Sequence, residues 1–509
     1  MSGWGVLRTA DANQLRALAS DDDPRAQRKE QELIRDWVLP DIPRDRVRGG
    51  RLKLPPELRV GVVGAGFAGL AAAWYLHELG VNVVVYEQSD HVGGRVLTDR
   101  TFIPGKIAEA GAELIGLNHP MWRRLARTFG LRLVELTFED EYTDAGLAVR
   151  LRFGDRQLTA DEKKALKKKV EQILNVIGYE AKDVDPAQPW WVENAIGLDS
   201  ISLSKRLDGI FGGGKPSDAR RLLEFKIGND NCAAPTEMSY LALLTAVSAG
   251  RMGDDAEGLR GYWDYTETHR CADGNQALAS NLADVLGGRV RLGDPVTGVK
   301  VVRTSTAGTV VIDTQAGYRD NFDYVILSAP ATVWDRIAFE PPLDRSKLAI
   351  SHGPAVKYMS RWPERFWEPT LAPSALWDEL GSVWETTDRQ DRTRPDHGLT
   401  VFSGGTYVRP EIDEYRRQLN VLYPSRERPK DDKLVDWPTV PGIMAGYAVP
   451  TVGQVMTVLR RLVTKPHADR VLFAGEQTSA GFYGYMEGAL QSGGCAAREV
   501  VKREGRRRW

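Results

Sequence analysis

The hydrophobic pattern of the chain becomes regular at Val60. A short β-rich run at residues 60–63 is followed by several glycines, an alanine-rich stretch that continues to His77, and a second β-branched run at 81–86. A buried strand, a helix and another buried strand in this order predict a β-α-β unit, whose two strands must run parallel. We therefore expect an α/β fold class for this region.

Further β-rich runs lie in the middle of the chain and are separated by turn residues. They cover residues 290–300, 309–314 and 324–328. The remaining stretches mix helical patterns with polar loops. The alternation predicts a Rossmann-like nucleotide-binding domain interleaved with a mixed α+β substrate domain. The nucleotide-binding domain is expected to comprise residues 56–120, 270–340 and 440–509, and the substrate domain residues 121–269 and 341–439.

Residues 1–55 precede this pattern and are predicted to form a helical arm. The segment from Asp21 to Pro24 suits the start of a helix, because acidic groups and proline are favoured there. The helix would run to Leu39, just before Pro40. An ordinary helix packed on the body of the protein is the simpler interpretation, and a partner-binding device is the alternative.

Composition narrows the classes of function. The chain is 42% hydrophobic and 27% charged, which is enough apolar material for a large core. Its 68 basic residues balance 69 acidic ones, so no net field attracts nucleic acid or anionic lipid. Glycine is abundant, at 50 of 509 residues, where ordinary usage is about 7%. This excess indicates that the backbone approaches something closely at several places.

The spacing of the cysteines and histidines does not indicate a disulfide framework or a metal centre. The three cysteines lack CxxC spacing and are typical of reduced thiols in a cytoplasmic protein. The seven histidines lack metal-ligand spacing. No basic stretch followed by an apolar one marks a leader, and the apolar run at 60–76 is broken by glycines and shorter than a span of about 20 residues. We therefore expect a cytoplasmic location, without metal, nucleic-acid or membrane partners.

The first strand leads directly into a dinucleotide-binding fingerprint. Gly64, Gly66 and Gly69 form GxGxxG between the strand and the helix, where they permit a tight turn, approach of the pyrophosphate, and close helix packing. Glu87 follows 18 residues after Gly69, at the end of the second strand, where an acid binds ribose hydroxyls. The residues expected against the dinucleotide are Gly64, Gly66, Phe67, Ala68, Gly69 and Glu87.

The segment that follows makes the pattern more specific. Six residues beyond Glu87 stand Gly93, Gly94 and Arg95. The whole run from Val62 to Thr98 resembles the N-terminal signature of the flavin-containing amine oxidase superfamily, which includes monoamine, polyamine and L-amino-acid oxidases. The resemblance implies FAD as the cofactor, with the GGR segment wrapped around it and the arginine near the pyrophosphate.

Other segments extend the resemblance over most of the chain. The segment Ala110–Glu113 is similar to the part of the family that runs past the flavin, and Asp273–Leu278 is similar to the block before the second set of nucleotide-domain strands. Val296, just after Asp294 and Pro295, is then implied to contact the adenine side. Leu327–Pro330 resembles a strand end of the same domain.

The C-terminal region resembles the second FAD motif of the family. Leu472–Glu476 and residues 485–493 carry this likeness. It implies that Gly475 lies against the FAD, that Glu476 faces the ribityl chain or the pyrophosphate, and that the helix opening near Met486 points its amides at the flavin ring.

The resemblance also assigns residues to the reaction. Lys357, upstream of the landmark 365–367, matches the family lysine that reaches flavin N5 through a water and assists reoxidation by oxygen. Tyr447 and Tyr485 fall where monoamine oxidases carry two facing aromatic rings, which align the amine before the flavin. Trp437 resembles the family tryptophan beside the isoalloxazine.

Two departures from the family pattern concern flavin attachment and substrate. Monoamine oxidases carry a flavin-bonded cysteine before the first tyrosine, where this chain has Gly446, so non-covalent FAD is implied. L-amino-acid oxidases place a carboxylate-binding arginine three residues after the glycine that corresponds to Gly111, where this chain has Leu114. An amine without an α-carboxylate is favoured, unless another arginine holds that group. Glu113 is expected either to meet a cationic group or to form buried hydrogen bonds, and Trp263 to belong to an aromatic-walled pocket.

Taken together, the resemblance implies an FAD-dependent amine oxidase. The expected reaction passes a hydride from the amine to flavin N5, reduces O2 to H2O2, and gives an imine that hydrolyses to an aldehyde or ketone plus ammonia or an amine. The alternative enzyme is an L-amino-acid oxidase or an amino-acid 2-monooxygenase. A flavin desaturase or mutase, or a flavin-fold binding protein without activity, is a further alternative. Family members often dimerise, which leaves a homodimer open.

Overall fold

The computed structural model describes residues 54–212, 215–253, 258–303, 308–425 and 428–506. The helix predicted between Asp21 and Leu39 in the N-terminal arm lies outside these residues. No helix in the described ranges is long and apolar enough to cross a lipid bilayer.

A five-stranded sheet carries the predicted β-α-β unit. Its order is β22-β13-β1-β2-β9, and every neighbouring pair runs parallel. Val60 pairs with Val83 of one neighbour and with Tyr324 of the other, so β1 is central and buried on both sides. The predicted α/β class is therefore confirmed. The strands are β1 (Arg59–Val63), β2 (Asn82–Tyr86), β9 (Val290–Arg291), β13 (Tyr324–Leu327) and β22 (Val471–Phe473).

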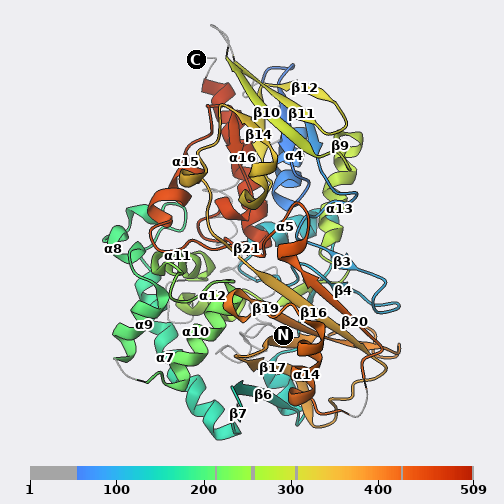
Figure 1. Ribbon diagram of the computed structural model, residues 1–509, viewed down its shortest axis with the longest axis vertical. Coiled ribbons are helices and arrows are strands. Elements are labelled where there is room, and N and C mark those ends of the chain that lie inside the picture. Colours follow the sequence, from blue (N-terminus) through green and yellow to red (C-terminus); the bar gives the residue numbers. More distant parts are fainter. Residues whose placement is uncertain (1–53, 213–214, 254–257, 304–307, 426–427, 507–509) are drawn as a thin grey trace.

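Four helices pack beside this sheet and share one hydrophobic core with it (Figure 1). Helices α4 and α16 approach closely because Gly493 has no side chain: a Cβ there would lie 2.3 Å from the Ala68 carbonyl oxygen. Met121 and Trp122 bring α5 into the same core. These helices are α4 (Phe67–Glu78), α5 (Pro120–Phe129), α13 (Gln276–Leu286) and α16 (Met486–Arg506).

A four-stranded sheet lies at the end of the molecule near β9 (Figure 1). The single β-rich run predicted at 290–300 is divided here, because the turn at Gly293 and Pro295 separates β9 from β10. The first short piece thus joins the parallel sheet and the second the four-stranded sheet. The strands of the latter are β10 (Val296–Arg303), β11 (Gly308–Thr314), β12 (Arg319–Phe322) and β14 (Ala338–Glu340).

The other half of the molecule is built on a seven-stranded sheet of order β20-β16-β19-β18-β17-β6-β7. It draws on residues 148–157 and 355–436, so it interleaves with the parallel sheet along the chain. The domain boundaries themselves remain predictions. The strands are β6 (Ala148–Phe153), β7 (Arg156–Gln157), β16 (Ala355–Trp362), β17 (Leu371–Trp377), β18 (Gly381–Glu385), β19 (His397–Gly404) and β20 (Asp431–Asp436).

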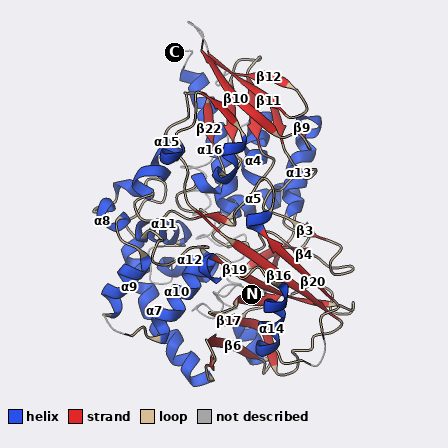
Figure 2. Ribbon diagram, in the orientation of Figure 1, coloured by secondary structure: helices blue, strands red, loops and turns tan. Residues whose placement is uncertain are grey.

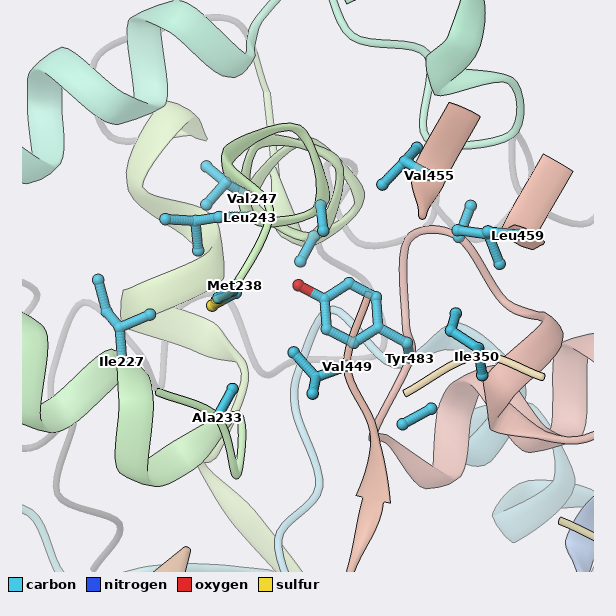
Figure 3. Packing of buried hydrophobic residues seen from close by; sticks show 14 of the residues in the cluster. Ile227, Ala233, Met238, Leu243, Val247, Ile350, Val449, Val455, Leu459 and Tyr483 are labelled. Carbon is cyan, nitrogen blue, oxygen red and sulfur yellow. The ribbon is translucent and has the colours of Figure 1, made fainter. Parts of the chain in front are cut away.

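Most remaining helices gather on one side of the lower half, opposite the seven-stranded sheet (Figure 2). They enclose a core in which the Tyr483 ring lies among Met238, Val449 and Ile350 (Figure 3). These helices are α7 (Ala160–Ala181), α8 (Ala195–Asp199), α9 (Leu203–Phe211), α10 (Asp218–Asp230), α11 (Tyr240–Gly250) and α12 (Gly261–Tyr265); α6 (Glu139–Asp144), α14 (Ile412–Leu422) and α15 (Arg460–Thr464) lie elsewhere.

Three two-stranded sheets complete the fold and pair distant segments. They are β3 (Thr98–Asp99) with β4 (Ala108–Glu109), β5 (Leu133–Glu135) with β8 (His269–Cys271), and β15 (His352–Gly353) with β21 (Tyr447–Ala448). The last of these sheets places Tyr447 close to the carboxyl end of β22, because the Ala448 amide donates to Glu476.

Candidate active site

A cavity of about 840 Å³ extends from the carboxyl ends of the parallel strands to the seven-stranded sheet. Open α/β sheets bind their ligands at this edge. We call the wall formed by Gly64, Glu87, Arg95 and Glu476 the sheet side of the cavity. The predicted residues on its walls are Gly64, Gly66, Phe67, Ala68, Glu87, Gly93, Gly94, Arg95, Glu113, Leu114, Val296, Lys357, Trp437, Tyr447, Gly475, Glu476, Tyr485 and Met486.

The glycine turn forms the floor of the sheet side. Gly64 has φ +104°, a conformation that side chains rarely adopt, and a Cβ there would lie 2.9 Å from Ser328 Oγ. Gly66 is the N-cap of α4 and faces open space, with its nearest neighbour 3.9 Å from a Cβ placed there. Gly69 does not line the cavity; its Cβ would lie 2.0 Å from the Gly64 carbonyl oxygen. The third glycine thus serves helix packing, and the first two leave the helix N-terminus accessible.

Glu87 is fixed at the end of β2 by its neighbours. One carboxylate oxygen accepts the Ala65 N–H at 2.7 Å, and the other accepts both the N–H and the hydroxyl of Ser89, at 3.0 and 2.8 Å. The side chain therefore stands in one orientation beside the turn. A carboxylate can accept further hydrogen bonds in this state, since its two oxygens offer about four acceptor sites.

The half-buried Arg95 and the buried Glu476 form an ion pair that joins the N-terminal and C-terminal motifs. Arg95 Nη1 lies 2.7 Å from Glu476 Oε1 and also donates to the Gly446 carbonyl at 2.9 Å. The amides of Ala448 and Gly484 donate to the same carboxylate at 3.1 and 2.6 Å. Burial raises the pKa of Glu476, but the Arg95 and His352 charges and the Gly484 amide outweigh it and hold the pKa below its ordinary value. The carboxylate is thus an anion whose oxygens are already engaged.

Strand β16 places Lys357 on the opposite wall. Its Nζ donates to the carbonyls of Glu109 and Gly111, both at 2.9 Å, and to Glu113 Oε2 at 2.8 Å. Trp384 Nε1 donates to both oxygens of Glu113 at 3.1 Å. Glu113 therefore takes part in a buried, hydrogen-bonded ion pair.

Glu109 lies behind this pair and is buried. It accepts the Asn275 N–H at 2.7 Å and the Thr98 hydroxyl at 2.9 Å. Burial raises the pKa of Glu109 to about 7, with the nearby Glu113 charge acting in the same direction and the Asn275 amide opposing both. This carboxyl group is accordingly poised to titrate near neutral pH.

Tyr447 and Tyr485 both face the cavity, each with its own support. The Tyr447 ring stacks parallel on Phe402, with centroids 6.4 Å apart, and its hydroxyl donates to the Asp230 carbonyl. The Tyr485 hydroxyl lies 3.1 Å from that of Tyr262. A Cβ on Gly484 would lie 2.9 Å from the Tyr447 ring, so this ring packs directly against the segment that carries Tyr485. Burial raises the pKa of both tyrosines well above the ordinary value, which keeps them neutral.

Three of the remaining predicted residues line the cavity, and one lies behind its wall. Trp437 packs with Ala355 and Tyr447 on the wall, and Leu114 is half-buried there. Val296 lines the cavity near the end of β2. Trp263, predicted to belong to the pocket, does not line it: the ring is 1% exposed and packs edge-on against Tyr262, with centroids 5.7 Å apart. It lies one layer behind the tyrosine that contacts Tyr485.

Four polar cavity residues, Lys226, Asp230, Asn231 and Glu267, do not belong to any motif found in the sequence. Lys226 and Asp230 form an ion pair one turn apart at the end of α10, with side chains 1% and 9% exposed. Burial raises the pKa of Asp230 to about 7, although the Lys226 charge opposes it. We call Tyr447, Tyr485, Lys226 and Asp230 the tyrosine side of the cavity. The i, i+4 spacing was visible in the sequence, but such pairs are usually exposed.

Among the solved structures with the same fold are two amine oxidases. A putrescine oxidase variant superposes with a TM-score of 0.73 at 23% identity, covering 88% of this chain and all of that one. Cyclohexylamine oxidase from Brevibacterium oxydans superposes with a TM-score of 0.72 at 22% identity, covering 88% of this chain and 99% of the other. These likenesses confirm the predicted interleaved two-domain fold.

Relatives found by sequence similarity include further amine oxidases. The chain is 24% identical to pig amine oxidase [flavin-containing] A and 25% identical to the dog B form, over 87% of this chain and 85% and 86% of theirs. It is 26% identical to nicotine dehydrogenase from Pseudomonas putida, over 86% of this chain and 87% of the relative. Residues 67–501 match the family described as flavin containing amine oxidoreductase. The protein therefore belongs to the flavin-containing amine oxidoreductase family.

Proposed function

We propose that this protein is an FAD-dependent oxidase of a small amine that lacks an α-carboxylate, with O2 as the electron acceptor. The observation that carries the proposal is a single cavity that joins the glycine turn and Glu87 to Lys357, Tyr447 and Tyr485. When bound, the flavin supplies a two-electron acceptor for a hydride from the carbon next to nitrogen. The products would be H2O2 and an imine that water converts to an aldehyde or ketone plus ammonia or an amine.

The sheet side suits the dinucleotide part of FAD. The accessible N-terminus of α4 after Gly66 offers amide donors and a positive dipole end to the pyrophosphate. Glu87, oriented by Ala65 and Ser89, accepts three hydrogen bonds already and has one acceptor site left for a ribose hydroxyl. Arg95 lines the same wall, and its guanidinium keeps N–H donors beyond those it gives to Glu476 and Gly446.

Non-covalent attachment is supported by the packing around Gly446. A Cβ at this position would lie 2.5 Å from the Cβ of Ala355 and 2.9 Å from its amide nitrogen, so a cysteine does not fit there. The protein's own three cysteines, Cys232, Cys271 and Cys495, are not among the residues that line the cavity.

The tyrosine side suits an uncharged amine close to its oxidation. Tyr447 and Tyr485 present neutral phenol rings, which orient the nitrogen without forming an ion pair. Leu114 lines the cavity at the sequence position where the resemblance to L-amino-acid oxidases expects a carboxylate-binding arginine. The names of the relatives agree, because putrescine, cyclohexylamine and nicotine all lack a carboxylate.

Flavin spectroscopy on the purified protein tests the proposal. We expect visible flavin absorbance, release of intact FAD into the supernatant when the protein is denatured, bleaching on anaerobic mixing with an amine panel, and H2O2 on return to air. A colourless protein would contradict the proposal and favour the binding-protein alternative. Bleaching by α-amino acids alone would show the Leu114 argument to be wrong. Bleaching without H2O2 would require an acceptor other than O2.

A further inference from the structure

The ammonium of Lys357 has no hydrogen-bond donor left for a ligand. A lysine ammonium carries three N–H groups and no acceptor. The carbonyls of Glu109 and Gly111 and one oxygen of Glu113 take all three, at 2.8 to 2.9 Å. The Lys357 and Glu113 side chains are only 6% and 2% exposed, so bulk water does not screen the pair.

Glu113 is itself held as an anion from several directions. Besides Lys357, it accepts from Trp384 on β18, and Arg270 on β8 lies 3.8 Å from its other oxygen. Burial raises the pKa of Glu113, but the Lys357 and Arg270 charges outweigh it and hold the pKa below its ordinary value. The carboxylate thus faces Lys357 with a full negative charge.

We propose that Glu113 is a positioning residue for Lys357: its carboxylate fixes the ammonium on the cavity wall and cancels its charge, so that a bound flavin meets a neutral pair. The inference rests on the proposed function, because it concerns the flavin expected in this cavity. Reduction adds negative charge to the flavin, and an uncompensated cation nearby favours the reduced form. Glu113 therefore keeps the midpoint potential of the flavin lower than Lys357 alone would set it.

Potentiometric titration of flavin-loaded variants tests this inference. At about pH 8, where Glu109 with its pKa of about 7 is ionised, Glu113→Gln should raise the midpoint potential by about 30 mV or more, equivalent to tenfold in the two-electron equilibrium constant. Lys357→Met should lower it by a similar amount. The double variant Glu113→Gln/Lys357→Met should return to near the wild-type potential, since both charges are removed together. Trp384→Phe is the control, because it removes a hydrogen bond to Glu113 and leaves every charge in place.

The outcomes separate the inference from the function on which it rests. An unchanged or lower potential in Glu113→Gln, or a double variant that stays displaced, would overturn the inference. If the role of Glu113 were purely structural, Glu113→Gln and Lys357→Met would shift the midpoint potential in the same direction. If Glu113→Gln alone does not retain flavin, the comparison of Lys357→Met with the double variant decides: the inference predicts a higher potential in the double variant, and equal potentials in the two would overturn it. A wild-type protein without flavin would instead contradict the proposed function.

Discussion

The glycine turn and the tyrosine pair differ in how far along the chain their partners lie. In the turn, Gly64, Gly66 and Gly69 follow one another closely, and Glu87 reaches Ala65 across 22 residues. In the pair, the Tyr485 and Tyr262 hydroxyls meet across 223 residues, and Tyr447 reaches the Asp230 carbonyl across 217. The turn depends on local backbone geometry, whereas the tyrosine contacts, like the Arg95–Glu476 ion pair across 381 residues, need the complete fold. A motif in the sequence can therefore reveal the contacts of the turn but not the hydrogen-bond partners of the tyrosines.

Removal of Lys226 should give the largest effect and damage the tyrosine side alone. Lys226→Met leaves the Asp230 carboxyl group buried without its cation, and breaking a buried pair costs about 3–5 kcal/mol. We expect this loss in the free energy of unfolding at about pH 9, above the Asp230 pKa of about 7, measured by denaturant titration, with flavin content per folded molecule unchanged. The matched control is Lys164→Met, at an exposed position of α7. An equal loss in both variants would contradict the buried pair.

Glu109 lies behind the Lys357 pair and should give stability an unusual dependence on pH. Its pKa rises from an ordinary 4.5 to about 7 on folding, so the folded protein binds this proton more tightly than the unfolded chain. The contribution of Glu109 to stability is therefore present below about pH 4.5 and is lost as the pH rises through about 7, by about 3 kcal/mol.

Glu109→Gln should remove this contribution. The free energy of unfolding of the variant should fall less than that of wild type between about pH 5 and about pH 8, and the variant should be the more stable protein at the higher pH. Glu57→Gln, at an exposed position, is the control. Parallel pH profiles for Glu109→Gln and wild type would show that Glu109 does not titrate in this way.

The converse experiment damages the sheet side through a single methyl group. In Gly69→Ala, the Cβ would lie 2.0 Å from the Gly64 carbonyl oxygen, so helix and turn must separate. Overpacking of this kind costs about 1–3 kcal/mol, and we expect FAD content to fall with it. Gly288→Ala, where a Cβ meets nothing within 4 Å, should be neutral. Normal FAD binding by Gly69→Ala would refute the role assigned to the turn.

The smallest effect should come from one hydroxyl on the tyrosine side. Tyr485→Phe keeps the ring and removes the hydrogen bond to Tyr262, which is worth about 1 kcal/mol. We expect amine oxidation to slow by up to about tenfold, with FAD content unchanged, in steady-state assays beside the exposed control Tyr318→Phe. A complete loss of activity would mean that the hydroxyl itself takes part in the chemistry.

Much of the parallel sheet was predictable because burial of both its faces gives continuous apolar runs. The run at 60–63 matches β1, and the helix predicted to His77 ends at Glu78. The β-rich run at 290–300 contains two strands, β9 and the start of β10, and its division depends on pairing with two different sheets. An apolar pattern in the sequence indicates that a strand is buried, but it does not indicate which sheet the strand joins.

The tyrosine side was only partly predictable. Tyr447 and Tyr485 were found through family resemblance, whereas Lys226 and Asp230 carry the spacing of an ordinary surface pair. Helix α10 packs against α7 and strand β19, which are distant in the sequence. Trp263 shows the reverse error: an aromatic residue suits a pocket wall, but it packs behind Tyr262 instead.

The most direct test of the account is a crystal structure of the protein with FAD and a non-reacting amine. We predict the ribose hydroxyls of the adenosine at Glu87, the pyrophosphate at the N-terminus of α4, and the flavin ring with the amine between Lys357, Tyr447 and Tyr485. A flavin whose ring lies at Glu87, or an amine bound outside this cavity, would contradict the claim that one cavity holds both.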